Sequence, residues 1–575
     1  MAHSATLSRF LSSNDPPTSL EAATLQAEVD ELLNRISQLE DQVHARRGAL
    51  SAIRRVPGEI LGEIFIHALP LIGTSTLDSK GRQSLIHLSL VCKKWRGAAL
   101  VCHRLWSSLR VEGREISFVG IKSWMVRSGR IPKRLEVVLE KKEKDEDEER
   151  DEGEDQDKEE DQDEEEDQDE QEDEQEDEED MEEGEQSDED NWEEENKNVQ
   201  SSEDVLAQLL TSGVPLDHFG VILSDPEDLE SLLNSLGDPD ASAKPRPWDG
   251  IRSLSLAFED DCRLDEPNVL GSLFLRLPET ITSFELHLTD SDALSVIEED
   301  LLFHKSILHL PESLAKRLTS FSISCDWGAQ HLFTLLEHCV NLEILILDFK
   351  YMECLWTADY IEYLEMNYLP RIKLPKLHTL RLRDVPPDVV QFLWHLEAPV
   401  LANLDFKFVD DGYNIDFDYE ALLTFLTTQS KCAAKLNSLR LAGDVRSDPE
   451  ELSLILDELP ALTHLALDNV LFNDDEYLLQ ALKKRCRGGI LRDPESFLPS
   501  LRVLELIGQV GQDNFHDLSG FLTSREQTLR SQDDRRLKEL VVAYSNLKPK
   551  PPPDLDAWQR KFLKSAIVVN IHPLR

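Results

Sequence analysis

One short apolar pattern repeats through the C-terminal two-thirds of the chain. Two apolar residues three positions apart are followed two positions later by a third, and this pattern occurs ten times with starts 24 to 39 residues apart. The ten copies are Ile251/Leu254/Leu256, Ile281/Phe284/Leu286, Leu318/Phe321/Ile323, Leu342/Leu345/Leu347, Leu377/Leu380/Leu382, Leu401/Leu404/Phe406, Leu436/Leu439/Leu441, Leu462/Leu465/Leu467, Leu501/Leu504/Leu506 and Leu537/Leu540/Val542. Each copy predicts a strand with one buried face.

Helix-like stretches such as 330–339 and 450–459 separate the copies. A strand–helix unit needs a neighbour to cover its hydrophobic edge, so the pattern predicts a curved stack of repeats. The shorter spacings fall in the range of leucine-rich repeats, and the irregular spacing favours a diverged, ribonuclease-inhibitor-like form. The alternative is a doubly wound α/β domain, which gives no reason for the recurring pattern.

Two stretches nearer the N-terminus carry apolar residues at helical spacing. The first runs from Ile60 to Leu69, with Pro57 suited to its first turn and Pro70 ending it. The second, at helical spacing throughout, comprises Leu85, Leu88, Val91, Trp95 and Ala98. Two short amphipathic helices need a third element or a partner to bury their apolar faces. From the pattern alone, an ordinary helical hairpin packed on the rest of the chain explains them equally well.

The stretch 20–55 has apolar residues alternating by threes and fours, which predicts a coiled-coil helix. Its seam, interrupted at Arg46, consists of Ala22, Leu25, Val29, Leu32, Ile36, Leu39, Val43, Leu50 and Ile53. About three heptads support a weak dimer. A helix that folds back on the next segment, or extends from it, is the alternative.

Charge is concentrated in one tract. Residues 141–200 hold 38 acidic and 6 basic side chains, and so contribute −32 of the net charge of −52. Such a run cannot bury enough apolar surface to offset the entropy of ordering, so we expect disorder. A strand–helix–strand pattern precedes it (107–111, 115–127 and 134–140) and helical patterns follow it. The tract is therefore predicted to be an insertion in a folded domain; it either attracts basic proteins or only adds solubility.

Composition excludes several functions. The negative charge argues against direct nucleic-acid binding, which needs clustered positive charge. The eight cysteines are scattered and fit free thiols in a reducing compartment. No signal sequence and no apolar run of about 18 residues is found, so we expect a cytoplasmic or nuclear protein without a membrane span. Phosphate-loop, nucleophile-elbow and zinc motifs are missing, so we expect no enzyme, metal or cofactor.

The segment around the two helical stretches resembles a known family. Val-Pro-Gly-Glu-Ile-Leu-Gly-Glu-Ile-Phe at 56–65 is followed by Leu-Ser-Leu-Val-Cys-Lys-Lys-Trp-Arg at 88–96 and Leu-Trp-Ser-Ser-Leu at 105–109. This is similar to the F-box of proteins from mushroom-forming fungi. The Trp-x-x-Arg-Ser-Gly at 124–129 matches the sequence motif that follows the F-box in those proteins. Two features depart from that pattern: Val56 stands where Leu is usual, and a polar insert, 71–84, separates the helices.

The resemblance implies docking on the Skp-type adaptor of an SCF-type cullin–RING E3 ubiquitin ligase, with the repeat region binding an unknown target protein. The residues that match the docking motif are Pro57, Ile60, Leu61, Phe65, Val91, Cys92 and Trp95. The competing hypothesis is a ligase-independent scaffold, or a binder of basic, histone-like proteins through the acidic insertion.

These observations together predict an α/β chain: a coiled-coil helix and a small all-α F-box, then an irregular leucine-rich-repeat solenoid with a disordered acidic insertion. The expected divisions are a disordered N-terminus (1–19), the coiled-coil helix (20–55), the F-box (56–110), a first strand–helix–strand unit (111–140), the acidic insertion (141–203) and the solenoid (204–575).

Overall fold

The structure is a computed structural model that divides into two compact units. Unit 1 comprises Met1–Gly73 and Ser79–Leu105, and unit 2 comprises Thr74–Asp78 and Trp106–Arg575. The residues it describes are 16–69, 76–113, 116–139, 202–237, 246–259, 273–288, 310–324, 332, 335–349, 371–385, 387–409, 417–443, 446–472, 477–486, 497–508, 515–528, 537–544 and 568–573. The segments predicted to be disordered lie outside these ranges, except for 16–19 and 202–203, where Ser19 and Ser202 each begin a helix.

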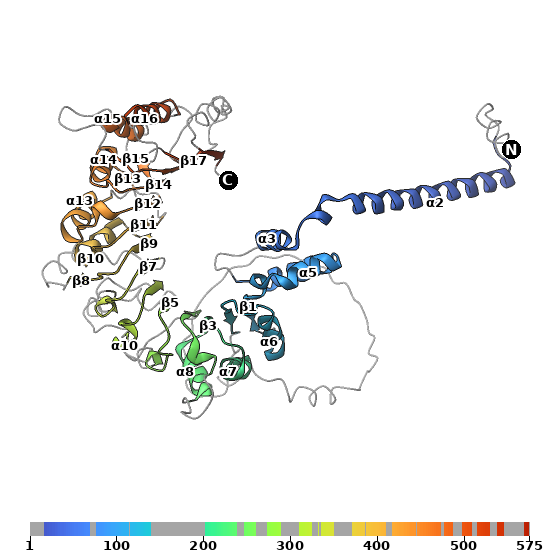
Figure 1. Ribbon diagram of the computed structural model, residues 1–575, viewed down its shortest axis with the longest axis horizontal. Helices are drawn as coiled ribbons and strands as arrows, with labels where there is room; N and C mark the ends of the chain where they lie inside the picture. The colour runs from blue at the N-terminus through green and yellow to red at the C-terminus, as the bar shows by residue number, and fades with distance from the viewer. Residues whose placement is uncertain are drawn as a thin grey trace, which may run out of the picture. The chain divides into compact units, whose positions relative to one another are not determined.

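The regular structure in the described part of unit 1 is all helical. It contains α2 (Ser19–Leu50), the 3₁₀ turn η1 (Ala52–Arg55), α3 (Gly58–Ala68), α4 (Ser79–Leu90) and α5 (Lys93–Val101) (Figure 1). The long helix α2 begins at a capping box, in which Glu21 N–H donates to the Thr18 hydroxyl and Thr18 N–H donates to the Glu21 carboxylate. In the compact part of the unit, α5 packs against both α3 and α4.

The second predicted helical stripe proves to be two helices. The backbone at Cys92 is extended, with φ −163° and ψ 167°, so α4 ends at Leu90 and Cys92 is the N-cap of α5. The spacing of the apolar residues does not show this break, because the residues of α4 and α5 follow one continuous helical period. Similarly, Pro57 is the N-cap of α3 and lies just outside the helix.

Unit 2 is built on a parallel sheet of fourteen strands among the described residues, and each strand lies next to its neighbour in the chain. In order, they are β1 (Ser108–Glu112), β2 (Arg134–Val138), β3 (His218–Leu223), β4 (Ser253–Phe258), β5 (Ser283–His287), β6 (Ser320–Ser324), β7 (Ile344–Asp348), β9 (Thr379–Val385), β11 (Asn403–Phe408), β12 (Ser438–Ala442), β14 (His464–Asp468), β16 (Val503–Ile507), β17 (Glu539–Tyr544) and β18 (Val568–Pro573). Two-residue strands form two small extra sheets, β8 (Ile372–Lys373) with β10 (Leu396–Glu397) and β13 (Arg446–Ser447) with β15 (Leu471–Phe472).

The helices of unit 2 lie along one face of the sheet (Figure 1). They are α6 (Phe118–Val126), α7 (Ser202–Ser212), α8 (Pro226–Leu236), α10 (Glu312–Ala315), α13 (Tyr419–Thr424), α14 (Pro449–Asp457), α15 (Tyr477–Cys486) and α16 (Phe515–Thr528). Shorter turns complete the connections: η6 (Trp248–Gly250), η9 (Pro387–His395), η10 (Phe425–Gln429) and η11 (Ala433–Lys435). Together, the large parallel sheet and the helices confirm the α/β class.

The core lies between the sheet and its helices. All ten apolar triplets belong to it, and each of their side chains is at most 5% exposed. The strands pair in register, so that Leu404, for example, is flanked by Leu380 and Leu439. Two further triplets of the same spacing were missed in the sequence and are equally buried: Trp106/Leu109/Val111 at β1 and Leu216/Phe219/Val221 at β3.

Two contacts near the start of the sheet connect segments that are distant in the sequence. The strands β2 and β3 pair in register on either side of residues 140–201, so the chain leaves and rejoins one sheet. At the edge strand β1, Arg110 N–H donates to the Leu77 carbonyl oxygen at 2.8 Å. Leu77 belongs to the insert predicted as a polar separator, and here it covers part of an otherwise unpaired sheet edge.

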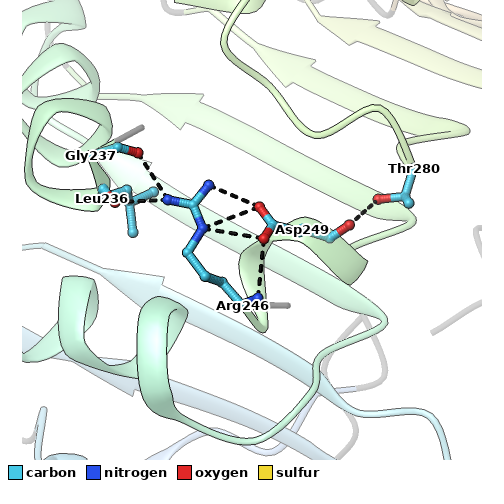
Figure 2. A network of polar contacts seen from close by, with 5 residues as sticks. All are labelled: Leu236, Gly237, Arg246, Asp249 and Thr280. Carbon is cyan, nitrogen blue, oxygen red and sulfur yellow. Dashed lines mark hydrogen bonds and ion pairs between the residues drawn. The ribbon is translucent and has the colours of Figure 1, made fainter. Parts of the chain in front are cut away.

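A polar network closes the C-terminal end of α8 (Figure 2). The Arg246 guanidinium donates to the carbonyl oxygens of Leu236 and Gly237, at 2.8 and 2.9 Å, and to the carboxylate of Asp249. These are helix-terminal carbonyls without an intrahelical partner, and a cation there also complements the helix dipole. The Thr280 hydroxyl in turn donates to the Asp249 carbonyl oxygen, which links this turn to the next connection.

Candidate functional site

The residues predicted to dock an adaptor fall into two groups in unit 1. Leu61 and Phe65 are fully buried, and Trp95 is half-buried against Phe65, with ring centroids 5.1 Å apart. All three residues lie on α3 or α5, and the Phe65–Trp95 ring pair joins the two helices. Their burial makes them part of the folded core of the unit, and none of them lies free on its surface.

The other four predicted residues are exposed. Pro57 and Ile60 come from the start of α3, whereas Val91 and Cys92 form the short connection between α4 and α5. Ile60 is 51% exposed and Val91 is 60% exposed. Exposed apolar side chains that gather into one patch mark protein-binding surfaces, whereas single ones are common on any protein.

Two more exposed apolar residues lie in the same motif segments but were not among the predicted docking residues. Ile64 lies one turn after Ile60 on α3, and Leu90 is the last residue of α4. They are 42% and 68% exposed. The signal in the sequence was the helical spacing itself, since residues four apart share a helix face. We call the set Pro57, Ile60, Ile64, Leu90, Val91 and Cys92 the apolar surface of unit 1.

Close packing behind this surface fixes the orientation of α3. A Cβ atom on Gly62 would lie 3.1 Å from the Cys102 Cβ, so a larger residue would require α3 or Cys102 to move by a few tenths of an ångström. Burial raises the pKa of the Cys102 thiol above its usual value, so this cysteine is a packing residue.

Unit 2 presents a second candidate surface, the sheet face opposite the helices. Side chains at alternate strand positions line this face. Across β1 to β5 the paired middle positions are Arg110, Glu136, Gly220, Ser255 and Glu285. We call this the polar face. None of these residues belonged to the predicted site, because a register between distant strands cannot be read from local periodicity.

A partly buried network occupies the polar face at β2 and β3. The Thr76 hydroxyl donates to the Glu136 carboxylate at 2.7 Å, and His218 Nδ1 lies 2.8 Å from the Ser253 hydroxyl. Burial raises the pKa of Glu136 and lowers the pKa of His218 to about 4, so His218 is neutral at physiological pH. Its Nε2 lies 3.9 Å from the Glu136 carboxylate, too far for a hydrogen bond.

Further along the sheet the polar face carries partly exposed pairs of acidic and basic side chains. Arg440 on β12 bonds to Asp468 on β14 at 2.8 Å and lies 4.0 Å from Asp405 on β11. His464 lies 3.0 Å from Glu505, on the neighbouring strands β14 and β16. Pairs that are partly open to solvent add little stability. They leave basic and acidic side chains along this face, which is suited to binding a polar protein surface.

Among the described residues no group of three or more His, Cys, Asp or Glu side chains is placed to hold a metal ion. No helix in the described part of the chain is long and apolar enough to cross a membrane. In comparisons with known proteins, no protein-family model matches the chain and no curated protein matches it either.

Proposed function

We propose that this protein is a substrate-receptor subunit of an SCF-type cullin–RING E3 ubiquitin ligase. In this proposal the apolar surface of unit 1 docks the Skp-type adaptor, and the polar face of unit 2 receives a target protein. The chain contributes proximity and orientation, and other subunits carry out ubiquitin transfer.

One observation supports the docking half most strongly. Unit 1 already has a core of its own in Leu61, Phe65 and Trp95, yet it leaves Ile60 and Val91 exposed at positions that match the F-box motif. Apolar side chains that the fold does not use for its own stability are available to a partner.

The strand order supports the repeat interpretation of unit 2. Fourteen parallel strands follow one another in chain order, as stacked strand–helix units require. A doubly wound sheet reverses its strand order at a switch point, and the observed order contains no reversal among the described strands. We therefore infer a diverged leucine-rich-repeat solenoid.

The test is a binding assay between the full chain and the purified Skp-type adaptor. The variant Ile60→Asp with Val91→Asp places two charges on the apolar surface while leaving the buried core intact, so we expect adaptor binding to be lost. Val126→Asp on α6 is the matched control, since Val126 and Val91 are both 60% exposed. Failure of the wild-type chain to bind, or unchanged binding by the double variant, would refute the docking proposal.

A second candidate function rests on the charge of 141–200, a net −32. In this alternative the tract binds basic, histone-like proteins independently of a ligase. Because β2 and β3 pair directly with each other, deletion of 141–198 leaves both strands of that pairing in place. Histone binding that disappears with the deletion, while adaptor binding persists, would establish this function as a separate one.

A further inference from the structure

The helix α2 carries an apolar seam that the described residues of its own chain leave exposed. The helix spans 32 residues, and none of its described side chains is buried. The seam residues are between 44% and 60% exposed from Val29 to Val43: Val29, Leu32, Ile36, Leu39 and Val43. Most helices in proteins are stabilised by packing of their apolar face, so we expect the seam of α2 to pack against a partner.

The residue types along the seam indicate which partner. With Leu25 at a d position, the a positions hold Val29, Ile36 and Val43, and the d positions hold Leu25, Leu32 and Leu39. β-Branched residues at a together with leucine at d favour a parallel, two-stranded coiled coil. We propose that α2 pairs in parallel with α2 of a second copy of this chain.

Charge complementarity supports this pairing. In a parallel dimer each g position faces the e position five residues later on the partner helix. Arg35 is at g and Glu40 is at e, so the dimer contains this attractive pair twice. Arg35 makes no ion pair with the described residues of its own chain, and neither does Glu40. The outer b, c and f positions are mostly polar, for example Asp30, Asn34 and Gln38.

The seam also sets the strength and the geometry of the dimer. Arg46 occupies the next d position, so the continuous seam covers about three heptads and the dimer is weak and concentration-dependent. At the exit of α2, the Lys94 ammonium donates to the Arg54 carbonyl oxygen at 2.7 Å, which ties η1 to α5. A parallel dimer therefore brings the helical units of both copies to the same end of the coiled coil.

The first experiment measures the mass of the full chain by sedimentation equilibrium over a wide concentration range. We expect a reversible monomer–dimer equilibrium for the wild type and a monomer for Leu32→Glu with Leu39→Glu. The matched control, Asn34→Glu with Gln38→Glu, adds the same charges to the outer face and keeps the dimer. A wild-type chain that stays monomeric, or a seam variant that still dimerises, would overturn the proposal.

The second experiment tests orientation without altering the apolar seam. Arg35→Glu or Glu40→Arg alone raises the dimer dissociation constant several-fold, and the two changes together restore it, because each then faces its opposite charge in parallel register. In an antiparallel pair g faces g and e faces e, so Arg35→Glu together with Glu40→Arg would not restore the dissociation constant. That result would show that the helices are not parallel.

A disulfide provides an independent readout. Leu25→Cys forms a covalent dimer on mild oxidation if the helices are parallel, judged against the unmodified chain oxidised in the same way. In an antiparallel pair centred on the seam, the two introduced cysteines lie about 27 Å apart and do not join. We expect the seam variants that lose dimerisation to keep adaptor binding by the apolar surface. A failure of the dimer proposal can therefore be told apart from a failure of the proposed function.

Discussion

The ring of Phe65 lies 5.1 Å from the ring of Trp95, with the two planes inclined by 52°. Phe65 comes from α3 and Trp95 from α5, so this contact joins the first two motif segments, 56–65 and 88–96, in one core. Tilted aromatic pairs at this distance add to the energy of burial. The contact also separates residues that hold unit 1 together from those that remain available on its surface.

Phe65→Ala should destabilise unit 1 by about 3–5 kcal/mol, because it leaves a cavity beside Trp95 in addition to the lost burial. Hydrogen exchange of α3 and α5 peptides measures the loss as reduced protection. Ile60→Ala, on the same helix but half exposed, should cost less than about 1 kcal/mol. Equal losses of protection in the two variants would contradict this division of roles.

Much of the sheet could be predicted from the sequence. Alternate burial on a strand explains the second and third residues of each triplet, and the first lies in the turn before the strand, so the ten strands that carry the pattern are visible in the printed residues. The join between Leu77 and Arg110 could not be predicted, because nothing local in either segment specifies the other. The break at Cys92 was hidden for a different reason, since two helices in phase and one continuous helix give the same spacing.

The candidate site was predictable only in part. The motif identifies α3 as apolar on a broad face, but four apolar residues within two turns do not reveal that Leu61 is covered and Ile60 is not. On the polar face, the proximity of Glu136 to His218 depends on the register between β2 and β3. The two strands lie far apart in the sequence, since β2 ends at Val138 and β3 begins at His218, so local periodicity offers no signal for that register.

Thr76→Val should destabilise unit 2 by about 1–3 kcal/mol at neutral pH, because it removes the hydroxyl donor to the partly buried Glu136 carboxylate. That hydrogen bond also lowers the pKa of Glu136, so its loss raises the pKa further. The cost should therefore shrink as the pH falls and Glu136 becomes protonated. Chemical denaturation at several pH values measures this, and Thr76→Ser, which keeps the hydroxyl, should behave like wild type.

His218 should make the stability of unit 2 depend on pH between about 6.5 and 4. Its folded pKa is about 4 against an ordinary value of 6.5, so the unfolded state binds more protons in this window. The free energy of unfolding therefore falls as the pH falls, by at most about 3 kcal/mol from this group. His218→Asn should flatten the dependence relative to wild type, with Arg134, Glu136 and Glu285 unchanged around it. Identical pH profiles for the two chains would show that His218 does not titrate in this way.

Gly220→Ala should disturb the contact between Thr76 and Glu136 by displacing the Glu136 side chain. A Cβ at this position would lie 2.9 Å from the Glu136 Cγ, and Glu136 is held in place by Thr76, so we expect a loss of about 1–3 kcal/mol in the free energy of unfolding. Gly250→Ala is the control, since a Cβ there meets nothing within 4 Å.

The cause is tested by repeating Gly220→Ala in a Glu136→Ala background. With the Cγ of residue 136 removed, the added methyl group has no close neighbour on that side, so most of its cost should disappear. Denaturant unfolding of the four chains in this cycle gives the coupling between the two positions. A cost that is the same in both backgrounds would mean that the glycine is required by the strand β3 itself, and that the position of Glu136 is set without it.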